Sequence, residues 1–149
     1  MTWQWNGRDL TEDDAEKYYG FVYCIHNLKE NKRYIGKKFF TKAGYRQVKG
    51  KRKKIRKPSD WPTYWGSNDK LIADVKRLGE ENFIREILHL CTNRSDCAYL
   101  ELKEQMIAKA LERDDYYNDW IMVKVSGKNL RFLPEQQQSY ISSKNKKNR

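Results

Sequence analysis

Two tyrosines, Tyr23 and Tyr34, lie eleven residues apart in short aromatic runs that read FVY and YIG. The pair Lys37 and Lys38 follows the second run. A phenol has an ordinary pKa of about 10, and nearby positive charge favours its ionised form. Two phenols beside two ammonium groups are therefore a candidate for proton-transfer chemistry, although such tyrosines more often pack as cross-strand partners.

A second candidate is Glu101, in the sequence ELKE. The residues that share its face of a predicted helix, within two turns, are small or neutral: Cys97, Ala98, Gln105 and Ala108. A carboxylate in such a trough is accessible, and burying it without a partner is costly. The pattern therefore predicts a bound metal ion or a cationic side chain beside Glu101, and an ion pair with Lys or Arg is the simpler explanation from the helix alone.

Positive charge is concentrated in one part of the chain. The net charge is +11, and the stretch from Lys29 to Lys57 holds fourteen Lys or Arg and a single acid, Glu30. Such a concentration indicates a polyanionic partner, most often nucleic acid, with a solvated loop as the alternative. We predict nucleic-acid contacts from these residues: Lys42, Lys49, Lys51, Arg52, Lys53, Lys54, Arg56 and Lys57, with Trp61 and Trp65 either stacking on bases or packing on the core.

Composition excludes several classes of protein. The chain of 149 residues is long enough for one compact domain, and no run of 18 apolar residues is present to span a membrane. The first residues lack the layout of a secretory signal, so we expect a cytoplasmic location. Three cysteines, at positions 24, 91 and 97, fit neither a disulfide framework nor a zinc site.

The candidate residues must be positioned by a hairpin. Residues 18–27 and 33–40 are rich in β-branched and aromatic side chains, and the LKENK stretch between them favours a turn. Strand alternation places Tyr34 and Lys38, but not Lys37, on one face. Gly36 shares that face, where the missing side chain allows a ligand or backbone to come close.

Two helices and a third strand follow. Asn68 is a predicted cap for a helix over 69–79, and Ser95 for a helix over 96–113 that carries Glu101 and Glu104. The strand predicted over 82–91 places His89 on the same side as Phe83, Arg85 and Ile87. The basic stretch 41–57 contains Gly44 and Gly50 and precedes Pro58, so we do not expect one long regular element there.

This order of features resembles the GIY-YIG nuclease family over roughly residues 18–120. The most specific piece is YIGK, and ELKEQMIAKALERDDYYN, from Glu101 to Asn118, is similar to the final helix and closing asparagine of that family. Phe21 and Val22 replace the glycine and isoleucine of the first motif. Where the family places an arginine this chain has Gly44, so Arg46 is the nearest replacement, with Arg52 and Arg56 as further candidates.

The resemblance implies a fold and an activity. We expect an α+β domain with a three-stranded antiparallel sheet flanked by helices, and a metal-dependent DNA endonuclease of phage-type or homing-like kind. The expected boundaries are an acidic N-terminal segment at 1–17, a nuclease domain at 18–123 with a basic insertion at 41–57, and a disordered basic tail at 124–149. Whether one copy or a transient dimer acts on DNA stays open.

The resemblance also assigns roles to individual residues. Glu101 would ligate Mg2+ or another divalent cation such as Mn2+, because these ions prefer oxygen ligands. The remaining roles are Tyr23 as general base, Tyr34 orienting the water or phosphate, Lys37 or Lys38 favouring the phenolate, Arg46 or its replacement clamping the phosphate, and Asn118 orienting nearby groups or fixing the backbone. The alternatives are a non-catalytic basic nucleic-acid-binding protein and an RNA-directed basic protein.

Overall fold

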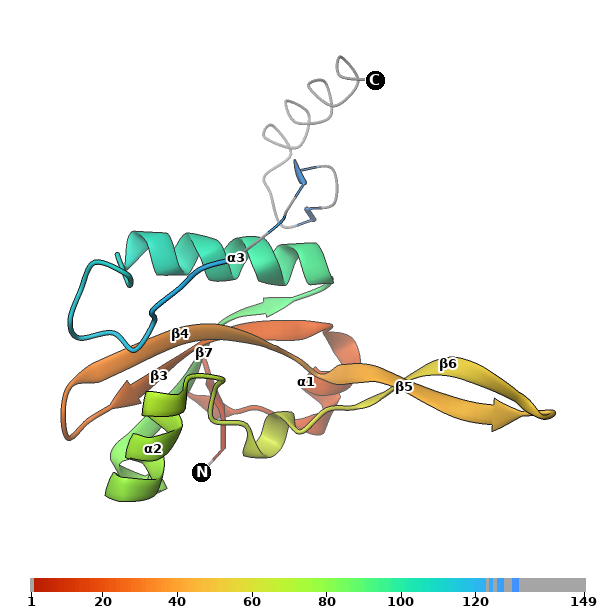
Figure 1. The fold of residues 1–149 in the computed structure, drawn as a ribbon, viewed down its shortest axis with the longest axis horizontal. Coiled ribbons are helices and arrows are strands. Elements are labelled where there is room, and N and C mark those ends of the chain that lie inside the picture. The colour runs from red at the N-terminus through yellow and green to blue at the C-terminus, as the bar shows by residue number, and fades with distance from the viewer. Residues whose placement is uncertain (1, 123, 125, 128–129, 132–149) are drawn as a thin grey trace, which may run out of the picture.

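The computed structural model describes residues 2–122, 124, 126–127 and 130–131. A central five-stranded sheet carries helix α3 on one face and α2 on the other, and a two-stranded ribbon extends from one end (Figure 1). The elements are β1 (Gln4–Trp5), β2 (Arg8–Asp9), α1 (Glu12–Lys17), β3 (Gly20–Asn27), β4 (Lys32–Phe39), β5 (Thr41–Val48), β6 (Lys51–Pro58), η1 (Trp61–Thr63), α2 (Asp69–Leu78), η2 (Glu80–Asn82), β7 (Phe83–Cys91) and α3 (Arg94–Ile107).

The sheet has the order β2-β1-β7-β3-β4. The predicted hairpin of β3 and β4 is confirmed, with Tyr23 opposite Gly36 and Ile25 opposite Tyr34. Strand β7 pairs antiparallel with β3, but Gln4 of β1 pairs parallel with Glu86 of β7. The α+β class is therefore correct, whereas the expected three-stranded antiparallel sheet is instead a mixed sheet of five strands.

The N-terminal segment joins the sheet through its own tight turn. Asn6 and Gly7 have φ values of 50° and 80°, the left-handed backbone that a two-residue hairpin turn requires. Trp3 is fully buried, and its Nε1–H donates to the carbonyl oxygen of Trp61 at 2.7 Å. Because residues 1–17 are acidic overall, their composition alone does not predict that Trp3 is buried or that Asn6 and Gly7 form a turn.

Each face of the sheet carries its own apolar core. Phe21, Tyr23 and Ile25 of β3 lie in the larger cluster, together with Trp3 and Phe83. The alternate residues Val22 and Ile35 face α3, where they pack with Cys91, Cys97 and Leu100. This alternation follows from the two-residue period of a strand, and it decides which face of β4 each candidate site residue occupies.

Strand β7 departs from the predicted alternation at a bulge. Its pairing with β3 runs from Tyr23↔Ile87 to Val22↔His89, so Leu88 is the extra residue and the faces exchange there. His89 consequently contacts Glu104 of α3 at 2.8 Å and does not share a side with Ile87. The prediction that placed His89 with Phe83, Arg85 and Ile87 is wrong for this reason.

The two long helices begin at asparagine caps. The side chain of Asn68 accepts from the backbone N–H of Leu71, as predicted, and Gly79 ends α2 with a φ of 92°. Helix α3 is capped by Asn93 and not by Ser95, because the Asn93 side chain accepts from the N–H of Asp96 at 2.9 Å. It ends at Ile107, earlier than the sequence pattern indicates.

The basic stretch forms a long ribbon of two paired strands. Eight residues of β5 pair antiparallel with eight of β6, and the turn between them places Lys49 at φ 51° and Gly50 at φ 75°. Positive φ at both central residues is the requirement of a type I′ turn. Figure 1 shows the ribbon extending away from the central sheet.

Two further expectations concern parts of the chain outside the sheet. The predicted disorder of the tail at 124–149 falls mostly on residues outside the described ones. Within the described part of the chain, no helix has both the length and the apolar character needed to cross a bilayer.

The burial of Trp3 predicts a large contribution to stability. Replacing a buried aromatic side chain by alanine costs about 3–5 kcal/mol, so Trp3→Ala should lower the free energy of unfolding by this amount in urea denaturation. Trp120→Ala is the control, because Trp120 is 67% exposed and its loss should change the free energy by less than about 0.5 kcal/mol. Equal effects of the two changes would contradict the N-terminal anchor.

Candidate active site

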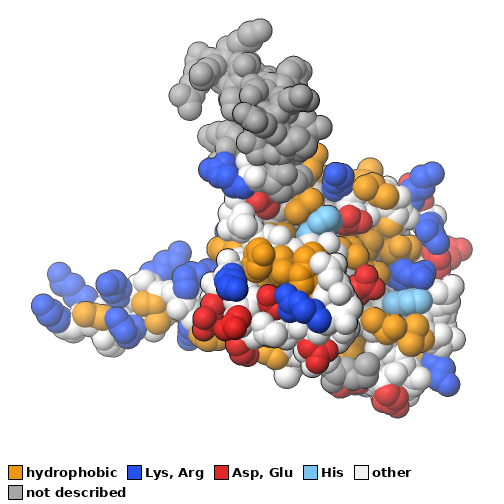
Figure 2. All heavy atoms as spheres, turned by 180° about the vertical axis from the view of Figure 1, so that it is seen from behind, with side chains coloured by type: hydrophobic (Ala, Val, Ile, Leu, Met, Phe, Trp, Pro, Cys, Tyr) orange, Lys and Arg blue, Asp and Glu red, His pale blue; other side chains and the backbone are white. Residues whose placement is uncertain are grey.

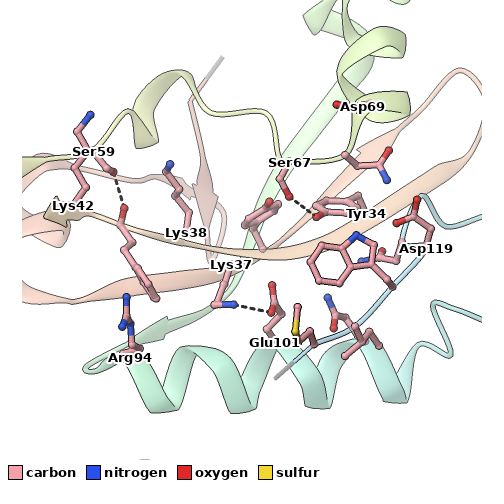
Figure 3. Close-up of a pocket in the computed structure, with 18 of the residues that line it drawn as sticks. Tyr34, Lys37, Lys38, Lys42, Ser59, Ser67, Asp69, Arg94, Glu101 and Asp119 are labelled. Carbon is pink, nitrogen blue, oxygen red and sulfur yellow. Dashed lines mark hydrogen bonds and ion pairs between the residues drawn. The ribbon is translucent and has the colours of Figure 1, made fainter. Parts of the chain in front are cut away.

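A groove with a volume of about 750 Å3 lies along the outer edge of β4. Its walls come from β4, the base of the ribbon, the start of α2, helix α3 and the segment after Asn118 (Figure 3). Six Lys or Arg and three acids line it: Lys37, Lys38, Lys42, Arg56, Lys70, Arg94, Asp69, Glu101 and Asp119. The groove is therefore cationic overall, which suits an anionic ligand.

The first half of the β4 edge is covered by the chain after α3. The backbone N–H of Arg33 donates to the carbonyl of Asp115, and the N–H of Tyr117 donates to the carbonyl of Arg33. Asn118 continues this pairing with its side chain, which accepts from the N–H of Ile35 at 3.0 Å and donates to its carbonyl at 2.7 Å. The groove begins beyond Ile35.

Asn118 therefore contacts the backbone of β4 directly. It is buried, and the amide of Gln105 donates to the same Ile35 carbonyl at 3.0 Å. Of the two roles expected for Asn118, the one supported by these contacts is fixing the backbone. Both amides hold the edge strand at the residue that precedes Gly36.

Tyr23 forms the floor of the groove and has no exposed surface. Its ring lies across Gly36 of the neighbouring strand, where an added Cβ would be only 2.5 Å from the Tyr23 hydroxyl oxygen. The close approach of a ligand or backbone predicted at Gly36 is instead made by the Tyr23 side chain. No larger residue fits at position 36 unless this ring moves.

Tyr34 stands beside Tyr23 on the groove side. The two ring centroids are 6.1 Å apart, and the Tyr34 hydroxyl shares a hydrogen bond of 3.0 Å with the hydroxyl of Ser67 (Figure 3). Gly66, with a φ of 87°, brings the chain close to the ring. The Tyr34 side chain is partly exposed, so its hydroxyl is the more accessible of the two.

Burial controls the acidity of both phenols. It raises the pKa of Tyr23 well above 10, and the neighbouring Tyr64, Tyr34 and Glu101 raise it further. Burial also raises the pKa of Tyr34, opposed by the hydrogen bond to Ser67. The expectation that a lysine favours a Tyr23 phenolate is not met in this arrangement, because burial is the dominant effect on that group.

Lys37 is paired with Glu101 across the groove. Its Nζ donates to Oε1 of Glu101 at 3.1 Å, and the two side chains are 30% and 16% exposed (Figure 3). Lys38 points to the other face of β4, where its Nζ donates to Asp60 at 2.6 Å and lies 4.0 Å from the ring centroid of Tyr64. Alternation therefore separates the two lysine candidates by face and by partner.

The carboxylate of Glu101 fits a divalent cation. It faces the groove and already attracts one positive group, the Lys37 ammonium, at the position where a cation would be bound. Among the described residues no group of three or more His, Cys, Asp or Glu is arranged to hold a metal. A single carboxylate with water and a substrate phosphate as the other ligands is consistent with the coordination habits of Mg2+.

The comparison with known families gives one match. The family model "Putative endonuclease segE, GIY-YIG domain" matches residues 3–121. The chain belongs to this GIY-YIG family. Searches of curated proteins and of solved structures found no match. The match supports nuclease activity in general, with DNA as the partner, and GIY-YIG nucleases generally use divalent metal ions.

The GIY-YIG domain brings only one of the three candidate arginines to the groove. Arg56 lines it and is held by hydrogen bonds to Thr41, at 3.1 Å to the hydroxyl and 2.8 Å to the carbonyl. Arg46 and Arg52 lie farther out on the ribbon, opposite Lys53 and Gln47, and do not line the groove. The structure therefore does not place Arg46 beside Glu101.

The other predicted nucleic-acid contacts divide into two groups. Lys42 lines the groove, whereas the remaining lysines of the ribbon are exposed beyond it: Lys49, Lys51, Lys53, Lys54 and Lys57. Trp61 is 6% exposed and packs against Phe40, and Trp65 packs against Phe83 and the Arg85 guanidinium. Both indoles therefore pack against the core, which is the alternative to base stacking that the sequence leaves open for them.

Sequence reasoning missed several residues of the groove. Arg94 begins α3 two turns before Glu101, and residues seven apart share a helix face, so both side chains reach the groove (Figure 3). Trp120 lines the groove with 67% of its surface exposed. The seven-residue spacing is visible in the sequence, but the position of Trp120 depends on how residues 115–118 pair with β4.

The buried phenol of Tyr23 predicts a loss of stability in alkali. The pKa of this phenol is higher in the folded protein than in the unfolded chain. Its contribution to the free energy of unfolding is therefore fully present below about pH 10 and declines as the pH rises further. Tyr23→Phe removes this decline. Urea denaturation at about pH 8 and about pH 11 should show wild type losing more stability than the variant, by up to about 1.4 kcal/mol per pH unit. The same loss in both proteins would exclude a raised pKa at Tyr23.

Proposed function

We propose that the protein is a divalent-metal-dependent endonuclease that hydrolyses DNA phosphodiester bonds, of phage-type or homing-like kind. The observation that carries the proposal is that Tyr34 and Glu101, from different elements, face one cationic groove at the open edge of β4. Hydrolysis of a phosphodiester needs an oriented water, relief of charge on the phosphate and help for the leaving oxygen. The groove residues supply groups for each task.

Glu101 is the residue that would hold the cation, Mg2+ or Mn2+. When bound, the cation supplies charge relief on the phosphate and on the leaving 3′ oxygen. The Lys37 ammonium, 3.1 Å from Glu101, would then be released to contact a phosphate oxygen. The guanidinium of Arg56 takes the clamping role proposed for Arg46, because it lines the groove and its fork suits a phosphate.

Tyr34 is the phenol we propose to contact the water or the phosphate. Its hydroxyl is partly exposed and linked to Ser67, and its raised pKa keeps it protonated at neutral pH, so it donates a hydrogen bond. The resemblance implies Tyr23 as the general base, yet Tyr23 is fully buried and protonated. We therefore propose that Tyr23 positions Tyr34, from a ring contact of 6.1 Å.

A second candidate function is DNA binding without cleavage. The observation that favours it is the Lys37–Glu101 pair, because a carboxylate that is neutralised by lysine has the cationic partner it needs. In that case the cationic groove and ribbon would supply affinity through counterion release. Cleavage by wild type that is lost on replacement of Glu101 distinguishes the first function from the second.

Glu101→Gln tests the metal ligand. Supercoiled plasmid incubated with wild type and Mg2+ should be nicked or linearised, and EDTA should abolish the cleavage. The variant keeps the shape of the side chain but loses its charge, so its cleavage rate should fall by about 100-fold or more, corresponding to about 2.7 kcal/mol of transition-state stabilisation. Binding of the same plasmid, measured in EDTA, should survive.

Lys103→Gln is the matched control for a single change on the same helix, at an exposed position outside the groove. It should cleave as wild type does. Cleavage that persists in Glu101→Gln would contradict the assigned ligand, and binding without any cleavage by wild type in Mg2+ or Mn2+ would favour the second function.

Arg56→Lys tests the phosphate clamp. Lysine keeps the charge but loses the fork, so we expect kcat to fall by about tenfold or more with a smaller change in KM. Arg46→Lys, farther along the ribbon, should change KM or its salt dependence in preference to kcat. A fall in kcat with Arg94→Lys and not with Arg56→Lys would assign the clamp to α3 instead.

A further inference from the structure

The ribbon of β5 and β6 carries positive charge on both of its faces. Nine Lys or Arg and no acid lie between Thr41 and Pro58. Directly paired residues share a face, so the pairs Lys42↔Lys57 and Arg46↔Lys53 project to one side. The alternate positions on β6 project to the other side, and they carry Arg52, Lys54 and Arg56.

Two contacts agree with this division of faces. The Arg52 guanidinium lies 3.9 Å from the ring centroid of Tyr45 on one side, and the Lys57 side chain covers Gly44 on the other. Figure 2 shows the cationic side chains distributed along the extended ribbon. A flat anionic surface would contact only one face, whereas a groove with anionic walls would contact both.

The base of the ribbon is fixed to the domain. The N–H of Ser59 donates to the carbonyl of Phe40 at 2.9 Å, and the Ser59 hydroxyl donates to the carbonyl of Phe39 at 2.6 Å. Phe40 is buried against Phe21. Lys42 and Arg56 at this base also line the groove that Glu101 faces, so a ligand held by the ribbon would extend into that groove.

The dimensions and chemistry of the ribbon select duplex DNA. Two strands about 4.8 Å apart and about 26 Å long, with side chains on both faces, fit a major groove about 12 Å wide, which admits a two-stranded ribbon. A minor groove of about 6 Å would have to widen to accept the same ribbon with its side chains. The major groove of duplex RNA is too narrow and deep for side chains. A single strand is bound through rows of aromatic side chains, and Tyr45 is the one aromatic residue of the ribbon.

We propose that the β5–β6 ribbon enters the major groove of double-stranded DNA, with its two faces against the opposite phosphate walls. This inference rests on the proposed function and specifies which surface of the protein holds the DNA. The two experiments are independent, because binding is measured in EDTA, where cleavage does not occur.

The test compares wild type with Lys51→Gln/Arg52→Gln/Lys53→Gln/Lys54→Gln, which removes four exposed charges from both faces of the ribbon. Binding of a short labelled duplex is followed by fluorescence anisotropy over a range of salt concentrations. The affinity of the variant should fall at least tenfold, and the slope of log K against log salt should decrease by about 3 to 4, from about 0.9 per phosphate contact.

The matched control removes four exposed lysines elsewhere: Lys17→Gln/Lys29→Gln/Lys76→Gln/Lys103→Gln. It should bind within about threefold of wild type, because the lost charges lie outside the ribbon and the groove. An equal loss in both variants would show that net charge alone governs binding and would overturn the proposal.

Two further measurements identify the DNA groove that the ribbon enters and the kind of nucleic acid that it binds. Bulky groups at C5 of the pyrimidines project into the major groove and should weaken binding, whereas netropsin, a minor-groove ligand, should not compete. Competition by netropsin with no effect of the C5 groups would overturn the proposal. Duplex RNA or single-stranded DNA that binds as tightly as duplex DNA, with the same dependence on the ribbon, would also overturn it.

Discussion

The site depends on one steric constraint, the Tyr23 ring that crosses Gly36 of the neighbouring strand. An added Cβ at position 36 would lie 2.5 Å from the Tyr23 hydroxyl, so these two positions are matched in shape. The same ring contacts Trp3 from the N-terminal segment and Tyr64 from the loop before α2. Tyr34 packs against this Tyr23 ring, so core packing helps to set the position of Tyr34.

The edge of β4 is the second element that the site requires. An edge strand presents backbone groups that need partners, and the segment from Asp115 to Asn118 satisfies them only as far as Ile35. Beyond Ile35 the strand borders the groove, and its alternation sends Lys37 to Glu101 on one face and Lys38 to Asp60 on the other. The groove is therefore lined by side chains from both faces of the sheet.

Charge is distributed between two regions of different composition. The groove contains acids among its bases, and the carboxylate of Glu101 pairs there with the Lys37 ammonium. The charged residues of the ribbon are all Lys or Arg. The ribbon extends from the wall of the groove, and Arg56 belongs to both regions. Attraction of an anionic partner over a large surface can then be provided by residues that lie outside the groove.

The sequence by itself determined the strands of Tyr23 and Tyr34, the presence of a helix at Glu101 and the family, because these depend on strand alternation, helical periodicity and local motif order. Tertiary structure alone decided that Lys37 and not Lys38 pairs with Glu101, that Arg56 and not Arg46 reaches the groove, and that Trp61 is buried. It also added β1 and β2 to the sheet and moved His89 to the face of α3. The physical reason is that local patterns fix which face a residue occupies, whereas its partner is set by contacts between segments distant in the chain and by a bulge that shifts the register.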